Sequence, residues 1–197
     1  MKRTNDSQVY KLVVTALMAA LCYVAFTFLK IPIPTFGGDY VALHIGNAFC
    51  VLAALLLGGG YGGVAGALGM TIADLLDPVY ITSAPKTFIL KLCIGLIAGF
   101  IAHRVAHISE DHDQKYILKW SLIASVVSLG FNVIMDPIFG YFYKKYLLGV
   151  QADAAAIMST WAAGVTLINA IAGTIVVVIV YAAVRPVLKK SGFWFRI

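Results

Sequence analysis

Polar and ionisable side chains interrupt the apolar stretches of this sequence at a small number of positions. Some occur in pairs at helical spacing, since His44 and Asn47 are three residues apart and Asn132 and Asp136 are four apart. Ionisable groups within apolar helices are costly in lipid, so they are expected to face one another or a cavity. The candidate ligand-contacting residues are His44, Asn47, Asp74, Lys86, Lys91, Asn132, Asp136, Trp161 and Asn169.

The chemistry that these side chains offer is hydrogen bonding and charge. Two arrangements are open: a structural network of hydrogen bonds and ion pairs, or a polar pocket that binds a small molecule. We favour the pocket, because a helical bundle in a membrane needs few polar groups to hold it together. Asp74 and Lys91 both lie near the expected ends of their helices, where they can pair with each other.

Sequence signatures of catalysis and of metal binding are missing. The chain has no Ser-His-Asp order, no His-Glu-x-x-His motif and no cysteine pair at metal-ligand spacing. We therefore expect no catalytic residue, no metal site and no cofactor. His103 and His107 are four apart and could form a metal pair, but no carboxylate supports them at the depth of the inner helix end, so solvation at the membrane surface is expected for both.

A glycine-rich run at residues 58–66 needs a separate interpretation. A phosphate-binding loop would place Lys and then Ser or Thr after the glycines, and neither is present. Gly59 and Gly63 are four apart, as are Gly62 and Gly66, which is the spacing of closely packed helices in membranes. The run therefore predicts a tight helical hairpin.

The elements that must position these residues are membrane helices. The chain has 197 residues, of which 61% are hydrophobic and 12% charged, and its mean hydropathy is +0.90. Soluble domains carry roughly a quarter charged residues, so the apolar excess must face lipid. We expect one all-α domain over 1–197, a bundle of six transmembrane helices at about 11–29, 43–58, 62–76, 84–106, 116–143 and 154–184. Pro137 is expected to interrupt the fifth span, and Arg185-Pro186 to end the sixth.

The distribution of basic residues predicts the orientation of this bundle. With the N-terminus inside the cell, ten basic residues fall in inner segments and four in outer segments, while Lys91 lies within a span. Both termini are therefore expected on the cytoplasmic side. The net charge of +6 is explained by this asymmetry, and we expect membrane lipid rather than nucleic acid as a partner.

The segment 30–42 is expected to form an outer loop. Pro32 and Pro34 stop a helix and hold the chain extended, and Gly37-Gly38-Asp39 forms the tip. With the N-terminus inside, the candidate residues other than Asn169 fall in the outer half of the membrane. The loop is long enough to fold over a pocket there as a lid.

Several of these segments together resemble a known family of transport proteins. They are 31–47 (IPIPTFGGDYVALHIGN), 52–58 (LAALLLG), 73–76 (ADLL), 84–87 (APKT) and 95–99 (GLIAG), with Lys91 between the last two. The pattern resembles the substrate-binding S components of energy-coupling factor (ECF) vitamin transporters, in the group of riboflavin, hydroxymethylpyrimidine and pyridoxine carriers. The resemblance is strongest over about residues 11–105 and extends to the last two spans only in pattern.

The resemblance implies a partner complex and a location. Such S components work with a transmembrane coupling protein of the EcfT type and two ATPase subunits, which supply the energy that this chain has no motif to provide. Ala16 and Ala20 match the family's small-x-x-x-small docking motif on the first helix; ordinary packing within the chain is the alternative. The expected location is the cell membrane, multi-pass, of a Gram-positive bacterium.

The chemistry of the candidate residues also bears on which vitamin is transported. The candidate residues are compact and polar, which favours hydroxymethylpyrimidine or pyridoxine over riboflavin or pantothenate. Two other functions stay open: a stand-alone proton-coupled transporter that uses Asp74 or Asp136, and a membrane enzyme or assembly factor without a transported substrate.

Overall fold

A computed structural model describes residues 3–35, 40–192 and 194 of the chain. Six α-helices occur in the described residues, in the expected order. They are α1 (Arg3–Phe28), α2 (Gly46–Leu57), α3 (Gly59–Leu75), α4 (Ala84–Gly99), α5 (Gln114–Tyr146) and α6 (Ala152–Lys190). The shorter elements are strands β1 (Lys30–Pro34) and β2 (Tyr40–His44), the 3-10 turn η2 (Ile81–Ser83) and the π-helix η3 (Phe100–Val105).

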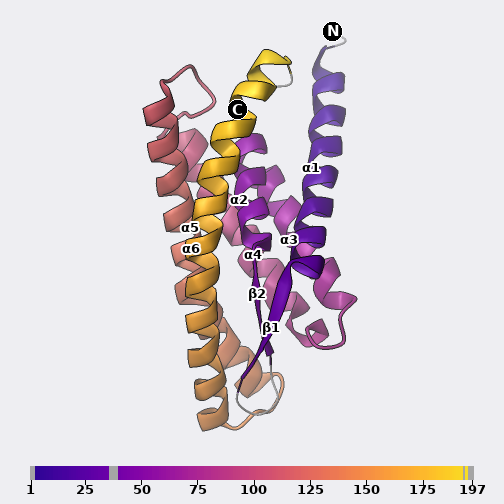
Figure 1. Cartoon of the computed structure of the whole chain (residues 1–197). Coiled ribbons are helices and arrows are strands. Elements are labelled where there is room, and N and C mark those ends of the chain that lie inside the picture. The colour runs from indigo at the N-terminus through magenta and orange to yellow at the C-terminus, as the bar shows by residue number, and fades with distance from the viewer. Residues whose placement is uncertain (1–2, 36–39, 193, 195–197) are drawn as a thin grey trace.

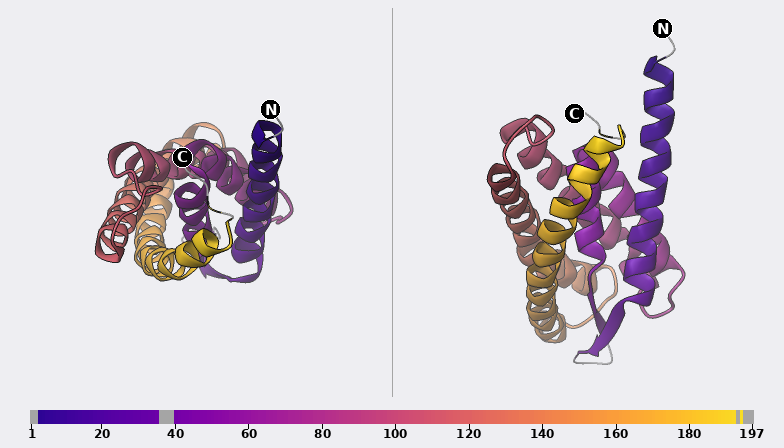
Figure 2. Two further views of the ribbon diagram at one scale, coloured as in Figure 1. Left: turned by 90° about the horizontal axis from the view of Figure 1, so that it is seen from above. Right: turned by 45° about the horizontal axis from the view of Figure 1, so that its top comes forward.

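The helices form one bundle in which α2 is the central element. Helices α5 and α6 lie side by side over the full height of the molecule, and α1 stands on the opposite side (Figures 1 and 2). Both termini lie at one end, called the terminal end below, and the β1–β2 hairpin extends toward the other, the hairpin end. Ten of the twelve residues of α2 are buried, because the helix is surrounded by α1, α3, α4 and α6.

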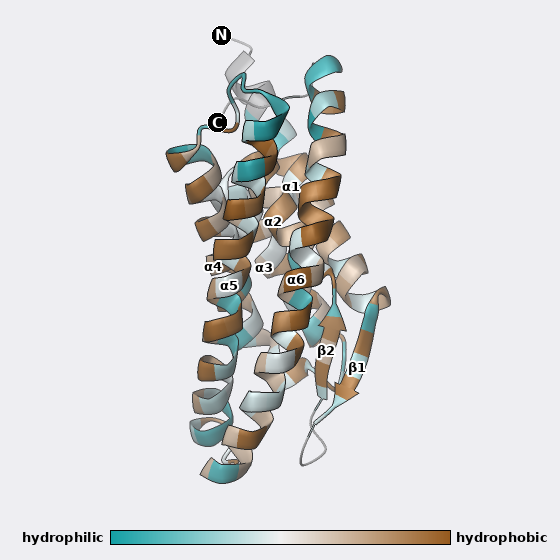
Figure 3. Cartoon of the chain, turned by 60° about the vertical axis from the view of Figure 1, so that its left-hand side comes forward, coloured by the Kyte–Doolittle hydropathy of each residue, from teal (hydrophilic) through white to brown (hydrophobic). Residues whose placement is uncertain are grey.

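The outer surface has the pattern of a membrane protein. Hydrophobic residues cover the middle of the helices, and hydrophilic ones gather in the connection after α4 and at the helix ends (Figure 3). Large apolar side chains such as Ile134, Ile168 and Ile179 are more than half exposed on α5 and α6. Such a surface is suited to lipid and not to water.

Glycines bring the first four helices into backbone contact. A Cβ atom added at Gly62 would collide with the backbone of Ala54 in α2, and one at Gly66 with Cys50. On another side of α3, a Cβ on Gly95 of α4 would collide with the backbone of Gly63. The close packing predicted from the glycine spacing is therefore confirmed, and α3 uses it toward two neighbours at once.

The prediction of six full crossings is supported only in part. Within the described residues, four helices are long and apolar enough to cross a membrane: 8–28, 81–105, 114–146 and 152–190. Helix α2 has 12 residues and α3 has 17. At a rise of about 1.5 Å per residue, α2 is about 18 Å long, well short of a hydrocarbon core of about 30 Å. The two helices meet at Gly58, whose φ of 86° permits the sharp turn between them.

The expected outer loop is an antiparallel β-hairpin, so the fold is not purely helical. Lys30 pairs with His44 and Pro34 with Tyr40 at the two ends of the ladder. The prolines hold the chain extended, as predicted, but the pairing with β2 was not predicted. The predicted tip at 37–39 lies outside the described residues.

Two prolines expected to break helices do not. Helix α5 is continuous through Pro137, and α6 continues through Pro186 to Lys190. Both predictions were wrong. Helices α5 and α6 contact each other extensively, and neighbouring groups in a membrane bundle can accommodate the backbone hydrogen bond that a proline removes.

His103 is buried rather than solvated at the surface, which corrects the prediction for this residue. Its ring nitrogens lie 2.8 Å from Ser109 Oγ and 3.0 Å from the carbonyl oxygen of Ala54. The π-helix η3 carries His103 inward while the next residue, Arg104, is exposed. His107, by contrast, is exposed as expected.

Candidate functional site

A polar cavity of about 90 Å³ lies where the β1–β2 hairpin meets the helices. All six helices and the hairpin contribute to its wall, so residues far apart in the sequence meet there. It is lined by Phe26, Tyr40, Val41, Ala42, His44, Asn47, Asp74, Tyr80, Ser83, Thr87, Lys91, Asn132, Asp136, Lys144, Thr166 and Asn169. Seven of the nine residues predicted from the sequence are among them.

Three buried side chains in this wall have acceptor oxygens without a partner. They are Asn47 Oδ1 on α2, both carboxylate oxygens of Asp74 on α3 and Asn132 Oδ1 on α5, none of which makes a hydrogen bond of good geometry to a described residue. The Thr87 hydroxyl is near enough to Asp74 to interact with it. The three side chains are at most 2% exposed. A buried acceptor without a partner is destabilising by roughly 1–3 kcal/mol, so three around one cavity indicate a place for donors from outside the chain.

Lys91 brings a positive charge to the same cavity. The residue is 7% exposed, and its ammonium group makes no hydrogen bond or ion pair with the part of the chain that the structure describes. A buried ammonium without a bonded partner is unfavourable in an apolar surrounding. Together with the carboxylate of Asp74 it lets the cavity both donate and accept strong hydrogen bonds.

The second lysine–aspartate pair of the site, Lys86 and Asp136, forms an ion pair within the chain. Lys86 Nζ lies 3.0 Å from Asp136 Oδ1, and Thr166 Oγ1 donates to Asp136 Oδ2 at 3.1 Å. Lys86 itself does not line the cavity, and it acts on the site through Asp136. The pair connects α4 to α5, and Thr166 adds α6 to this connection.

Asn169 attaches the hairpin to α6. Its side-chain oxygen accepts a hydrogen bond from the His44 backbone N–H, and its amide nitrogen donates to the carbonyl oxygen of Ala42, both at 2.9 Å. The side-chain amide therefore supplies hydrogen-bond partners to one backbone N–H and one backbone carbonyl of β2. Both polar atoms of Asn169 are used in this way, so the residue positions the hairpin over the cavity.

His44 is oriented by its own backbone and by an aromatic neighbour. The backbone N–H of Gly46 donates to His44 Nδ1 at 3.0 Å, and the ring meets Phe26 edge-on at 4.6 Å between centroids. Because Nδ1 accepts, the proton of the neutral ring is on Nε2. The Nε2–H group is therefore the one donor of the ring that remains available at the cavity wall.

A second attachment of the hairpin lies outside the predicted site. Lys30, the first residue of β1, forms an ion pair with Asp77 in the connection after α3, and its ammonium lies 4.7 Å from the centre of the Tyr80 ring. The hydrogen bond from Lys30 lowers the pKa of Asp77 below its usual value. The hairpin is thus fixed to α6 on one side and to the α3–α4 connection on the other.

Trp161 is the predicted site residue that the structure does not bring to the cavity. It is 55% exposed and lines a separate apolar groove with Ile33 and Leu43. Helical spacing explains this, because Trp161 and the cavity-lining Thr166 are five residues apart and lie on different faces of α6.

Several lining residues were not predicted from the sequence. Thr87 is four residues before Lys91, and Thr166 is three before Asn169, so helical spacing from a predicted residue was the available signal. Phe26, Tyr80 and Lys144 had no such signal, because the backbone path alone brings them to the cavity.

Comparison with known proteins gives one match. Residues 6–186 match the family model described as ECF-type riboflavin transporter, S component. The chain matches no curated protein sequence and no solved structure.

Proposed function

Since the chain belongs to the family of ECF-type riboflavin transporter S components, we propose that it is the membrane-embedded subunit that binds the vitamin for an ATP-driven importer. The observation that carries this proposal is the set of unpartnered buried groups around one cavity: Asn47, Asp74, Asn132 and Lys91. The chain's own residues hold these groups in place, and a bound ligand would complete their hydrogen bonds.

The ligand that fits this cavity best is small and polar. Drug-sized ligands occupy pockets of about 300–1,000 Å³, whereas this cavity has about 90 Å³. A single heteroaromatic ring with hydroxymethyl groups, such as pyridoxine or hydroxymethylpyrimidine, needs less rearrangement than the three fused rings of riboflavin. Asn47, Asn132 and Asp74 would accept from hydroxyl or amino groups, and Lys91 would donate to a ring nitrogen or oxygen.

The energy for transport would come from partner subunits. Ala16 and Ala20 are exposed on α1, while Thr15, Met18 and Cys22 face the core. This placement favours Ala16 and Ala20 as a docking face for the transmembrane coupling protein and its two ATPases over a role in packing within the chain. With the termini in the cytoplasm, the cavity would lie toward the outer side of the membrane.

The direct test is equilibrium binding to the purified chain. Pyridoxine, hydroxymethylpyrimidine, riboflavin and pantothenate are titrated by calorimetry, and the small molecules that co-purify with the chain are identified by mass spectrometry. One of the two single-ring compounds is expected to bind most tightly. Tighter riboflavin binding would reject the single-ring preference while leaving the vitamin-binding role intact.

The transport arrangement has its own test. Proteoliposomes that contain only this chain should not accumulate the vitamin, and addition of the coupling protein and ATPases should start uptake that depends on ATP. Uptake by the chain alone, abolished by a protonophore, would instead support a proton-coupled transporter.

A further inference from the structure

A second and larger recess lies at the terminal end of the molecule, away from the vitamin cavity. It is a groove of about 870 Å³ where α3 begins and where α4 passes into the π-helix η3. Lys11 of α1 borders it on one side and Arg104 on another, and its apolar wall includes Leu96 and Phe100. The proposed vitamin-binding role makes no use of this groove.

An open position at the start of α3 and an irregular helix shape the groove. Gly58, Gly59, Gly60 and Gly99 all line it. A Cβ atom added at Gly60 would meet nothing within 4 Å, so the space beside the start of α3 is open. The wider winding of η3 turns His103 inward, where its ring is hydrogen-bonded, and leaves Arg104 exposed.

The charge of the groove has one sign. Lys11 and Arg104 line it, and no Asp or Glu among the described residues does. The guanidinium of Arg104 makes no hydrogen bond or ion pair with a described residue. Helix α3 starts at the groove without an acidic residue in its first turn or a side-chain cap, so its N–H groups add to the positive potential.

The apolar wall of the groove adjoins these two charged residues. Leu96 is 45% exposed and Phe100 is 61% exposed, and both lie within two turns of Arg104 on the α4–η3 segment. The hydrophilic connection at 106–113 follows this segment (Figure 3), so along the chain Arg104 lies at the boundary between the apolar helix and polar residues. Basic recesses between membrane helices at this depth bind anionic lipid headgroups.

We propose that this groove binds one anionic phospholipid. Its phosphate lies between Lys11 and Arg104, and an acyl chain follows Leu96 and Phe100 toward the middle of the membrane. The charge complementarity favours this occupant over a zwitterionic lipid, whose headgroup would bring a second positive charge to the two cations. It also favours lipid over a docked protein helix, because the exposed small-residue face of α1 at Ala16 and Ala20 provides a separate, uncharged surface.

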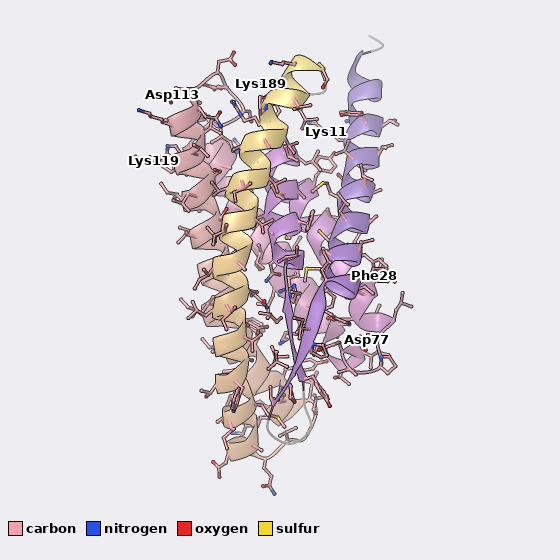
Figure 4. The ribbon with its side chains drawn as sticks, in the orientation of Figure 1. Lys11, Phe28, Asp77, Asp113, Lys119 and Lys189 are labelled. Carbon is pink, nitrogen blue, oxygen red and sulfur yellow. The ribbon has the colours of Figure 1, made fainter. Side chains whose placement is uncertain are left out.

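The test is native mass spectrometry of the full chain with phosphatidylglycerol or phosphatidylcholine. The double variant Lys11→Gln/Arg104→Gln removes both cations, and Gly60→Leu fills the groove without changing its charge. The control Lys115→Gln/Lys119→Gln removes two exposed cations outside the groove. Lys119 lies at the same end of the molecule as Lys11 (Figure 4). Vitamin affinity reports that each variant is folded, and it is independent of the lipid measurement.

The wild-type chain should retain one phosphatidylglycerol per molecule in preference to phosphatidylcholine. The double variant should bind phosphatidylglycerol at least about tenfold more weakly, since each surface cation contributes about 1 kcal/mol to attraction of an anionic lipid. Gly60→Leu should show a similar loss, and the control pair should keep wild-type binding. Equal losses in the double variant and the control, or unchanged binding in Gly60→Leu, would overturn the proposal. The proposal would also be overturned if the double variant kept the lipid but no longer co-purified with the ATPases. That result would identify the groove as a protein interface.

Discussion

The polar residues of the cavity fall into two groups that differ in whether the chain itself satisfies them. Asn169, Lys86 and Asp136 have protein partners at ordinary hydrogen-bond distances. Asp74 and Lys91 have no ion-pair partner and no hydrogen bond of good geometry among the described residues. Because unpaired buried groups are unfavourable, the second group is the one that a ligand would complete, and the first holds the walls and the hairpin in place.

Replacing a residue of each group should separate these roles. Lys91→Met should weaken vitamin binding about 10- to 100-fold, the equivalent of one hydrogen bond to a charged group at about 1.5–3 kcal/mol, with an unchanged or raised melting temperature.

Asn169→Ala should lower the melting temperature and speed hydrogen exchange of the β2 amides, because two hydrogen bonds to the hairpin backbone are lost. Calorimetry and amide exchange measure these effects, and unaltered affinity in Lys91→Met would return this lysine to a structural role.

The ion pair between Lys30 and Asp77 predicts a specific dependence on pH. The pKa of Asp77 is lowered in the folded protein, so the pair contributes fully above the ordinary aspartate value of about 4 and is lost as pH falls through the lowered pKa. Asp77→Asn should release the hairpin and speed vitamin dissociation. The ratio of the variant's dissociation rate to that of the wild type should be constant from about pH 8 to pH 5, and it should approach one only as pH falls through the lowered pKa of Asp77. A ratio that changes between pH 6 and pH 7 would show that another group controls the hairpin.

At the scale of elements, the glycines and the hairpin perform different tasks. Glycines allow α3 to contact α2 and α4 through the backbone, which makes a rigid inner wall from two helices too short to cross the membrane by themselves. The hairpin is attached by side chains at a few points, Asn169 and Lys30 among them. Loss of one of these attachments is therefore expected to loosen the hairpin before it affects the packed helices.

The glycine contacts predict unequal effects of one methyl group. Gly95→Ala places a Cβ against the backbone of Gly63 and should destabilise the protein by about 1–3 kcal/mol through overpacking. The control Gly164→Ala, in α6, has open space around the new Cβ and should be neutral or stabilising by up to about 1 kcal/mol. Unfolding in detergent micelles compares the two, and equal stabilities would argue against backbone contact between α3 and α4.

At the scale of the whole molecule, the surfaces that we propose for vitamin binding and for docking are separate. The vitamin cavity lies beneath the hairpin, whereas Ala16 and Ala20 are exposed on the side of α1 that faces away from the bundle core. This separation predicts that transport and binding can be lost independently.

A bulky side chain on the docking face tests this separation. Ala16→Trp should abolish ATP-dependent uptake and co-purification with the coupling protein, while vitamin affinity stays within about twofold of the wild type because Ala16 does not line the cavity. Val126→Trp is the matched control, since Val126 is 53% exposed on α5, away from α1. Parallel loss of binding and transport in Ala16→Trp would contradict the docking role.

The sequence by itself determined the membrane environment, the order of the six helices and seven of the sixteen residues that line the cavity. Hydropathy identifies lipid-facing helices because the bilayer accepts few charged groups, and the same cost makes His44, Asn47, Asp74, Lys91 and Asn132 conspicuous within apolar runs. The spacing of Gly59, Gly62, Gly63 and Gly66 likewise predicted close packing, because only a missing side chain lets backbones meet.

Only the tertiary structure decided which of these residues are bonded within the chain and which line the cavity. Local sequence does not show that Asn169 closes the β2 backbone, that Lys30 reaches Asp77, or that Trp161 points away from the cavity, because each depends on which helix lies opposite. Two further features also depend on contacts between distant segments. They are the pairing of the hairpin strands and the uninterrupted courses of α5 through Pro137 and of α6 through Pro186. In each case contacts between distant segments outweigh the local preference of the chain, and such contacts exist only after the bundle has assembled.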